Sequence, residues 1–248
     1  MILDEAHEHA VEEENYFVSM TDMMVGLVFI FIILLMYFAL QFRQVTDELT
    51  GADATRAQIL SQIQQSLKQK GVEVSIDTQN GVLRLPDSIL FDSGRDQLKP
   101  EGEAAVGKLS MALEEVLPCY TKSQTNAPRP GRCAATDHAI ESVYIEGHTD
   151  RDVFSGGGRD NWDLSVVRAT NTYRALVAAR PDLSALCAIK GGQCEPVLSV
   201  SGYGPQRPID TGDSVEAKAK NRRIDLRIIM VAPDSGETVR QVEQALQK

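Results

Sequence analysis

The chain has 248 residues, of which 43% are hydrophobic, and a formal net charge of −10. This length allows one globular domain of ordinary size in addition to a membrane segment and a linker. The acidic balance, without a dense lysine and arginine cluster, argues against nucleic acid as a partner. We find no glycine-rich phosphate loop followed by a lysine, and we expect neither enzymatic activity nor a cofactor.

Residues 1–19 form an acidic segment at the start of the chain. It contains no lysine or arginine, and its carboxylates are Asp4, Glu5, Glu8, Glu12, Glu13 and Glu14. We interpret it as a solvated, partly disordered cytoplasmic tail. The sharper alternative is a mouth that attracts cations, or a docking segment for a partner subunit.

An uninterrupted apolar run follows from Met23 to Leu40. A bilayer core about 30 Å thick needs about 20 helical residues, so we assign residues 20–42 to a transmembrane helix, retained as a signal anchor. Asp22 stands at its head and is the only charged residue between Glu14 and Arg43. A carboxylate at the centre of such a helix costs about 2.5–3.5 kcal/mol, and less near an edge. This cost indicates a functional residue, with ion transfer as the first hypothesis and a plain interfacial residue as the rival.

Residues 43–71 are predicted to form a connector. Its helix runs from Ala54 to Lys70, has apolar residues at Ile59, Ile63 and Leu67, and stops at Gly71. A stripe this narrow on a polar helix indicates either pairing with a second copy of the chain, as a homodimer, or packing on its own domain.

Residues 72–248 are predicted to form one α/β sandwich, with a mixed sheet and helices on one face, so that the whole chain is α+β with a single N-terminal membrane helix. Alternation around Asn80-Gly81 predicts a β-hairpin from 72–77 and 82–85. The further expected elements are helices from Pro100 to about Leu117, 162–180 and 215–220, strands at 142–147, 197–201 and 224–231, and a short C-terminal surface helix.

The four cysteines are Cys119, Cys133, Cys187 and Cys194. They lack zinc-site spacing, so we expect no metal centre. Each neighbouring pair brackets a loop that contains glycine or proline, which favours the pairs 119–133 and 187–194 over the other two pairings. Disulfides persist in oxidising compartments, which favours a location of this domain outside the cytoplasm over the alternative of free thiols in a cytosolic domain. Arg43 and Arg56 after the membrane segment lean towards the opposite orientation.

Three polar clusters in the C-terminal domain suggest a binding site. Asp150 ends the predicted strand, and Asn161, Leu164 and Arg168 share one face of the following helix. Arg222 directly precedes the last strand. An acid and a guanidinium brought together would suit a zwitterionic ligand, whereas each residue taken alone is more simply a cap or a surface ion pair.

Five segments in order resemble the OmpA-like peptidoglycan-binding domain. They are Ile89–Gly94, Gly147-His-Thr-Asp150, Asn161-x-x-Leu164-Ser165-x-x-Arg168-Ala169, Gly202-Tyr-Gly204 and Asn221–Asp225. The resemblance implies that Asp150 and Arg168 bind the diaminopimelate group of the peptide stem, with Asn161, Leu164 and Arg222 as flanking contacts. The loop from Arg151 to Asp160 is longer than the family's usual spacing, and both cysteine-bearing segments are extra.

Residues Tyr16 to Leu27 resemble the membrane segment of MotB, ExbD and TolR-type stator subunits. The resemblance implies that Asp22 carries an ion, taken to be a proton, and that two copies sit within five MotA-like partner subunits. It also implies an inner-membrane location, with the N-terminus cytoplasmic and the C-terminal domain periplasmic. The acidic tail and cysteines are most similar to the MotB-like subunit of Zorya anti-phage systems. A flagellar or ExbD/TolR-like subunit and a purely structural cell-wall anchor are the alternatives.

Overall fold

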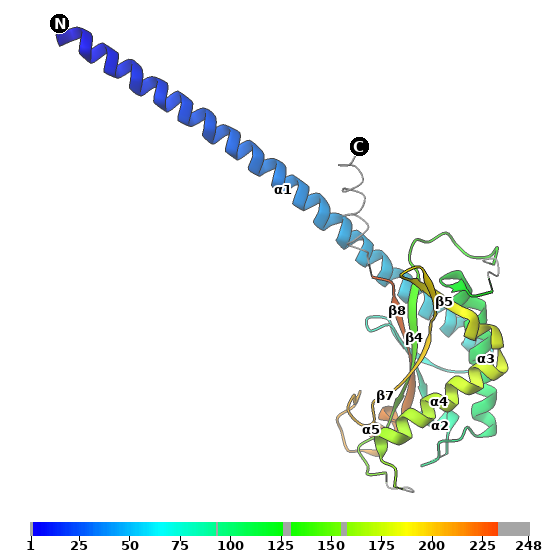
Figure 1. Ribbon diagram of the computed structural model, residues 1–248. Helices are drawn as coiled ribbons and strands as arrows, with labels where there is room; N and C mark the ends of the chain where they lie inside the picture. Colours follow the sequence, from blue (N-terminus) through cyan, green and yellow to red (C-terminus); the bar gives the residue numbers. More distant parts are fainter. Residues whose placement is uncertain (1, 93, 126–129, 155–157, 233–248) are drawn as a thin grey trace. The chain divides into compact units, whose positions relative to one another are not determined.

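The computed structural model describes residues 2–92, 94–125, 130–154 and 158–232. The chain divides into two compact units, Met1–Leu49 and Thr50–Lys248. Helix α1 (Ile2–Gln69) contains every described residue of the first unit, and its C-terminal part is the first element of the second unit (Figure 1). Residues 2–19 are therefore helical, and the prediction of a partly disordered tail, made from the acidic composition, is wrong. The predicted C-terminal surface helix lies outside the described residues.

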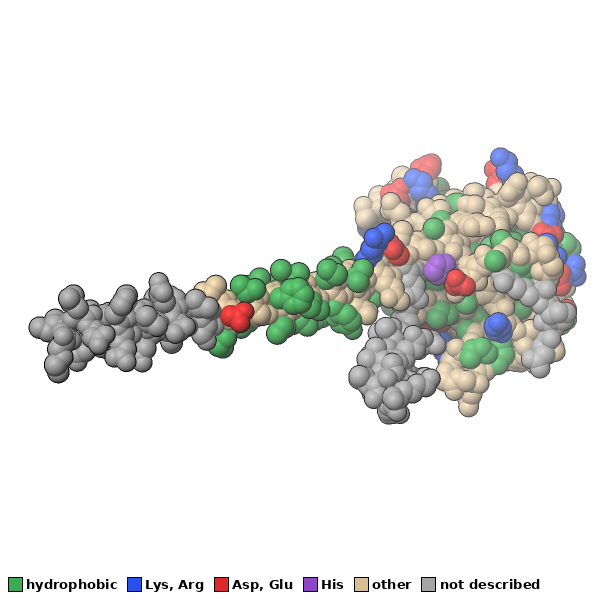
Figure 2. All heavy atoms as spheres, turned by 90° about the horizontal axis from the view of Figure 1, so that it is seen from above, with side chains coloured by type: hydrophobic (Ala, Val, Ile, Leu, Met, Phe, Trp, Pro, Cys, Tyr) green, Lys and Arg blue, Asp and Glu red, His purple; other side chains and the backbone are tan. Residues whose placement is uncertain are grey.

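The apolar part of α1 exposes its side chains. Every large hydrophobic side chain from Met23 to Leu40 is exposed, and the least exposed of them, Leu34, still has 48% of its surface accessible. Figure 2 shows these hydrophobic side chains around the helix. This is the one helix in the described part of the chain that is long and apolar enough to cross a membrane. A bare apolar surface of this size is unstable in water, which is consistent with a single-pass membrane protein.

The second unit is built on a mixed five-stranded sheet in the order β1-β2-β8-β4-β7. Its strands are β1 (Ser75–Asp77), β2 (Val82–Pro86), β4 (Ile140–His148), β7 (Leu198–Gly202) and β8 (Arg223–Met230). All neighbouring pairs are antiparallel except β4 and β7. The predicted hairpin turns at Gly81, which has a φ of 69°, and the predicted mixed sheet with helices is confirmed.

Helices α3 (Pro100–Val116) and α4 (Asn161–Ala179) pack with the last turns of α1 to form the core beside the sheet (Figure 1). The short helices are α2 (Asp87–Leu90), α5 (Val215–Asn221), η1 (Leu117–Cys119) and η2 (Pro181–Ala185). Ile59, Ile63 and Leu67 have at most 1% of their surface exposed. The apolar stripe of the expected connector therefore packs on its own domain, which decides between the two alternatives.

A second, three-stranded sheet in the order β3-β5-β6 was not predicted. It consists of β3 (Lys122–Ser123), β5 (Leu186–Lys190) and β6 (Gln193–Pro196). The segment between Cys187 and Cys194, expected as a loop, is instead a β-hairpin of β5 and β6, because Gly191 and Gly192 both have positive φ and form its turn. A Gly-Gly pair between two strands is a recognised signal for such a turn, so the sequence did contain the information.

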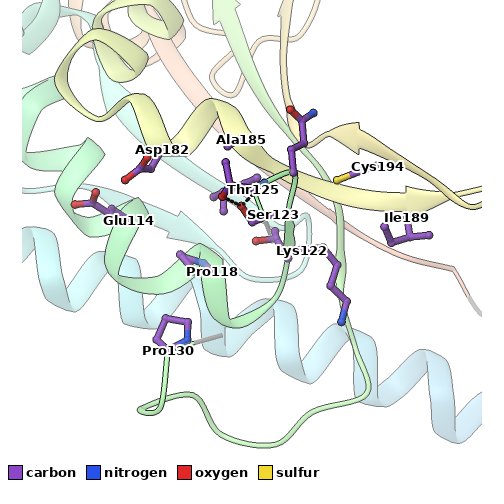
Figure 3. Close-up of a pocket in the computed structure, with 13 residues that line it drawn as sticks. Glu114, Pro118, Lys122, Ser123, Thr125, Pro130, Asp182, Ala185, Ile189 and Cys194 are labelled. Carbon is purple, nitrogen blue, oxygen red and sulfur yellow. Dashed lines mark hydrogen bonds between the residues drawn. The ribbon is translucent and has the colours of Figure 1, made fainter. Parts of the chain in front are cut away.

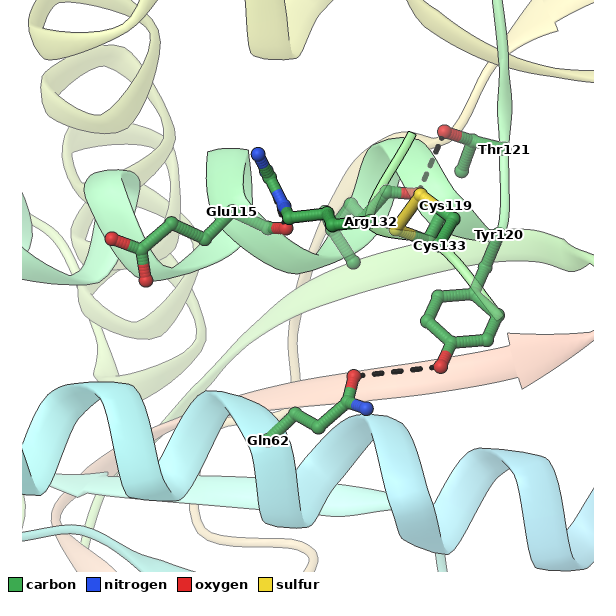
Figure 4. Close-up of a disulfide and its surroundings, with 8 residues drawn as sticks. Gln62, Glu115, Cys119, Tyr120, Thr121, Arg132 and Cys133 are labelled. Atoms are coloured by element: carbon green, nitrogen blue, oxygen red, sulfur yellow. Dashed lines mark hydrogen bonds between the residues drawn. A yellow bond between two sulfur atoms is a disulfide. The ribbon is translucent and has the colours of Figure 1, made fainter. Parts of the chain in front are cut away.

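Both predicted disulfides are present, Cys119–Cys133 and Cys187–Cys194, with Cα–Cα distances of 5.2 and 5.4 Å. The first joins the end of η1 to the long segment before β4 (Figure 4). Beside it, the Tyr120 hydroxyl donates a 3.4 Å hydrogen bond to the Gln62 side chain of α1. The disulfide thus ties the segment before β4 to η1, and the Tyr120 hydrogen bond ties the same region to α1.

Candidate functional site

The site forms where the start of α4 crosses β4. An Asp160 capping box opens α4: its side chain accepts from the Asp163 amide at 3.1 Å, and the Asp163 carboxylate accepts from the Asp160 amide at 3.0 Å. The crossing is close, because a Cβ atom on Gly147 would overlap the main-chain oxygen of Ser165. Glycine in the Gly-His-Thr-Asp segment therefore brings Asp150 towards Arg168 of the helix.

Arg168 is buried, with 2% of its surface exposed, and all three of its nitrogen atoms contact the protein. Its Nε donates to the Arg95 carbonyl at 2.7 Å and one Nη to the Asp92 carbonyl at 3.3 Å. The other Nη pairs with the Asp87 carboxylate at 2.9 Å. The Phe91 ring lies 5.0 Å from the guanidinium carbon, close enough for a cation–π contact. Carbonyls and an aromatic ring hold the guanidinium in addition to the ion pair.

Asp87 is the buried acid that faces Arg168. Burial raises the pKa of Asp87 from 3.8 to about 6, even though the charges of Arg168 and Arg222 act in the opposite direction. Burial likewise lowers the pKa of Arg168 below its usual value. Both charges are therefore costly to keep in this position, and any group that offers Arg168 a better-solvated negative charge could replace Asp87.

Asp150 has a different partner. Its carboxylate accepts from Arg222 Nη1 at 2.5 Å, and its other oxygen accepts from the Asp152 amide at 3.2 Å. The side-chain amide of Asn161 donates to the Asp152 carbonyl at 2.8 Å. The Asp87 amide in turn donates to the Arg222 carbonyl at 3.1 Å, so the two ion pairs are neighbours.

The structure thus gathers the predicted residues into one region but pairs them unexpectedly. Asp150 and Arg168 do not pair with each other in the described structure, since each has an oppositely charged partner within the chain. Leu164 is buried, with 4% exposed. Sequence reasoning missed Asp87. The available signal was an acid two residues before the Ile89-Leu-Phe91 segment, but nothing in the pattern distinguishes it from an ordinary helix-starting Asp.

A second charged cluster lies on the sheet face that points away from the core. Glu146 accepts from two Arg227 nitrogens at 2.9 Å each, and Asp225 accepts from Arg223 at 2.9 and 3.1 Å. Both acids and the neighbouring His148 are almost fully buried and could together surround a metal ion. Because the carboxylates already bind guanidinium groups, a further cation there would be repelled, and we assign the cluster to structure.

Elsewhere, a groove of about 650 Å³ lies between η1, β3 and the β5–β6 hairpin (Figure 3). Glu114, Pro118 and Lys122 line it on one side, and Asp182 and Ile189 on the other. None of the predicted binding residues lines this groove. It belongs to the cysteine-bearing segments, and it does not bear on the Asp150 and Arg168 region.

Comparison with known proteins gives relatives of two kinds. Over 176 residues the chain is 28% identical to motility protein B of Bacillus subtilis, covering 69% of this chain and 55% of that protein. It is 28% identical over 144 residues to outer membrane protein A of Serratia odorifera, covering 58% and 49%. The matches therefore span about half the length of these relatives. No protein-family model matches the chain.

Among solved structures, a MotB-like protein from Desulfovibrio vulgaris superposes with a TM-score of 0.49 at 21% identity, covering 73% of this chain and 93% of that one. The sequence matches support the expected resemblance to MotB-like proteins with an OmpA-type domain. The assignment to Zorya systems stays a prediction.

Proposed function

We propose that this protein is a single-pass inner-membrane subunit that is anchored to peptidoglycan by its C-terminal domain. The carrying observation is the combination in one chain of an exposed, membrane-length apolar helix and a domain with neighbouring acidic and basic groups in a MotB-like sequence. In this arrangement the N-terminus is cytoplasmic and the disulfide-bearing domain is periplasmic, where disulfides persist. A reporter that is active only in the periplasm, fused to the C-terminus, should be active, and a cytoplasmic signal would contradict this orientation.

The wall-binding site exchanges internal ion pairs for pairs with the ligand. A diaminopimelate group carries an ammonium and a carboxylate at fixed spacing. Its carboxylate takes the guanidinium of Arg168, and its ammonium takes the Asp150 carboxylate, with Asn161, Leu164 and Arg222 around them. Two such charge-assisted contacts in a largely buried site give selectivity for a zwitterion over a singly charged group.

Arg168→Ala tests this site. We expect the variant to lose co-sedimentation with isolated peptidoglycan, because the ligand carboxylate loses the buried guanidinium that it pairs with in this proposal. Arg174→Ala is the matched control, since Arg174 is exposed on the same helix. If Arg168→Ala binds as tightly as the control, the proposed wall-binding site is refuted.

We further propose that Asp22 carries a proton between this subunit and a ring of MotA-like partners, two copies of the chain within five partner subunits. Each elementary charge that crosses the membrane releases about 2.3 kcal/mol per 100 mV. The wall anchor holds this subunit still, so that the released energy moves the partner ring. Anti-phage defence of the Zorya type is the client that we propose, with flagellar or ExbD/TolR-like transduction as the alternative.

Asp22→Asn separates this motor from a purely structural anchor. The amide keeps the shape of the side chain but cannot exchange a proton, so we expect ion flux and biological activity to vanish while the complex still assembles. Asp47→Asn is the control, because Asp47 is an exposed acid on the same helix beyond the apolar run. Full activity of Asp22→Asn would exclude the motor.

A further inference from the structure

The buried ion pair between Asp87 and Arg168 occupies the same guanidinium that a ligand carboxylate needs. Arg168 has 2% of its surface exposed and the Asp87 side chain 6%. An incoming carboxylate therefore has no solvent-facing donor on Arg168 to bind in the described structure. It must take the place of the Asp87 carboxylate, which lies 2.9 Å from the guanidinium.

Asp87 is not needed to hold Arg168 in position. The Arg95 carbonyl at 2.7 Å, the Asp92 carbonyl at 3.3 Å and the Phe91 ring at 5.0 Å fix the guanidinium from other directions. These contacts come from main-chain atoms and an uncharged ring, and they remain when the Asp87 charge is removed. Asp87 therefore occupies a donor nitrogen of Arg168 while other contacts orient the guanidinium, and a group in this position competes with a ligand carboxylate.

We propose that Asp87 is an internal competitor for the wall ligand, a carboxylate that holds Arg168 in a closed pair until it is protonated or displaced. The inference rests on the proposed peptidoglycan site and adds a residue and a regulating condition to it. Its consequence is that acidity on the domain's side of the membrane favours attachment to the wall.

The surrounding charges determine how Asp87 responds to pH. It faces Arg168 on α4, Arg222 ahead of β8 and Asp150 after β4, and Asp96 lies close enough to act on Arg168. The two arginines oppose protonation, whereas Asp150 and burial favour it, and the pKa of Asp87 is about 6 as a result. If binding requires the neutral acid, the competent fraction changes about 30-fold between pH 5 and pH 7.5.

The test measures binding of the full chain in detergent to isolated peptidoglycan that contains meso-diaminopimelate, at pH 5 and pH 7.5. For the unmodified protein we expect up to about 30-fold tighter binding at pH 5. Asp87→Asn should bind at pH 7.5 as tightly as the unmodified protein does at pH 5, and should lose this pH dependence. Asp182→Asn, which removes one charge outside the site, should behave like the unmodified protein.

The outcomes separate this inference from the proposed function. If Arg168→Ala abolishes binding but Asp87→Asn binds no more tightly than the unmodified protein at pH 7.5, Asp87 is not a competitor. A flat pH profile of the unmodified protein overturns the inference as well, and this measurement stands even where Asp87→Asn does not fold. If Arg168→Ala leaves binding intact, the wall-binding site itself fails.

Discussion

Glu146→Gln tests the charged cluster on the outer face of the sheet. Burial alone would raise the pKa of Glu146, but the neighbouring His148, 3.9 Å away, and the hydrogen bonds from Arg227 outweigh it and hold the pKa at about 2, against 4.5 for an unperturbed group. This difference corresponds to about 3 kcal/mol of stability at pH 7. The variant removes the buried charge and leaves Arg227, whose side chain is 26% exposed, beside a neutral amide, so we expect a loss of up to this size.

The assay is urea unfolding of the full chain in detergent, followed by the fluorescence of Trp162, the single tryptophan of the chain. Glu146 has a lowered pKa, so its contribution is present above pH 4.5 and is lost as the pH falls towards 2. The difference between variant and unmodified protein should therefore fall to about half near pH 3. Glu141→Gln is the control, since Glu141 lies on the same strand with 32% of its side chain exposed. Equal stability at pH 7, or a difference that does not shrink in acid, would refute the reasoning.

Three further predictions concern stability. Replacing Cys119 and Cys133 by serine should cost about 3 kcal/mol, because the disulfide closes a loop with a sequence separation of 14; an unchanged urea midpoint would contradict this. Gly147→Ala should cost about 1–3 kcal/mol and weaken peptidoglycan binding, because the methyl group meets the Ser165 oxygen; wild-type stability and binding together would show that α4 can shift freely. Because the pKa of Asp87 is raised, the unmodified protein should lose up to about 3 kcal/mol of unfolding free energy as the pH rises from about 4 to 6, and Asp87→Asn should not show this loss. Unfolding curves of the variant with the same pH dependence as the unmodified protein would count against the burial argument.

Elements with a strong periodic pattern and a stop signal were predictable. The helix predicted from Pro100 to about Leu117 is observed over Pro100–Val116, because proline starts it and its apolar positions repeat at helical spacing. The strand predicted at 142–147 is observed over Ile140–His148. The second sheet was not predictable in the same way, because its strands have only two to five residues and are too short to show a clear alternation.

The composition of the site was predictable, but its pairing was not. Motif spacing places Asp150 just after a strand and Arg168 within the following helix, and β4 and α4 do bring them into one region. Which charges pair depends on residues outside the motifs. Asp87 reaches Arg168 from a four-residue helix whose position follows from the β2–β8 pairing, and local sequence carries no information about that contact.

Arg222, the C-cap residue of α5, and Arg223, which starts β8, show why such pairing depends on the fold. Arg222 and Arg223 read as one basic segment in the sequence, but successive side chains of a strand point to opposite faces. Arg222 pairs with Asp150 of the proposed wall-binding site, whereas Arg223 pairs with Asp225 on the outer face. The strand register sets Glu146 opposite Asp225, and two buried acids so placed would repel each other without the arginines beside them. Arg223 therefore stabilises the sheet by neutralising these acids. In the proposed wall-binding site, Arg222 is the arginine that can exchange its partner Asp150 for a ligand.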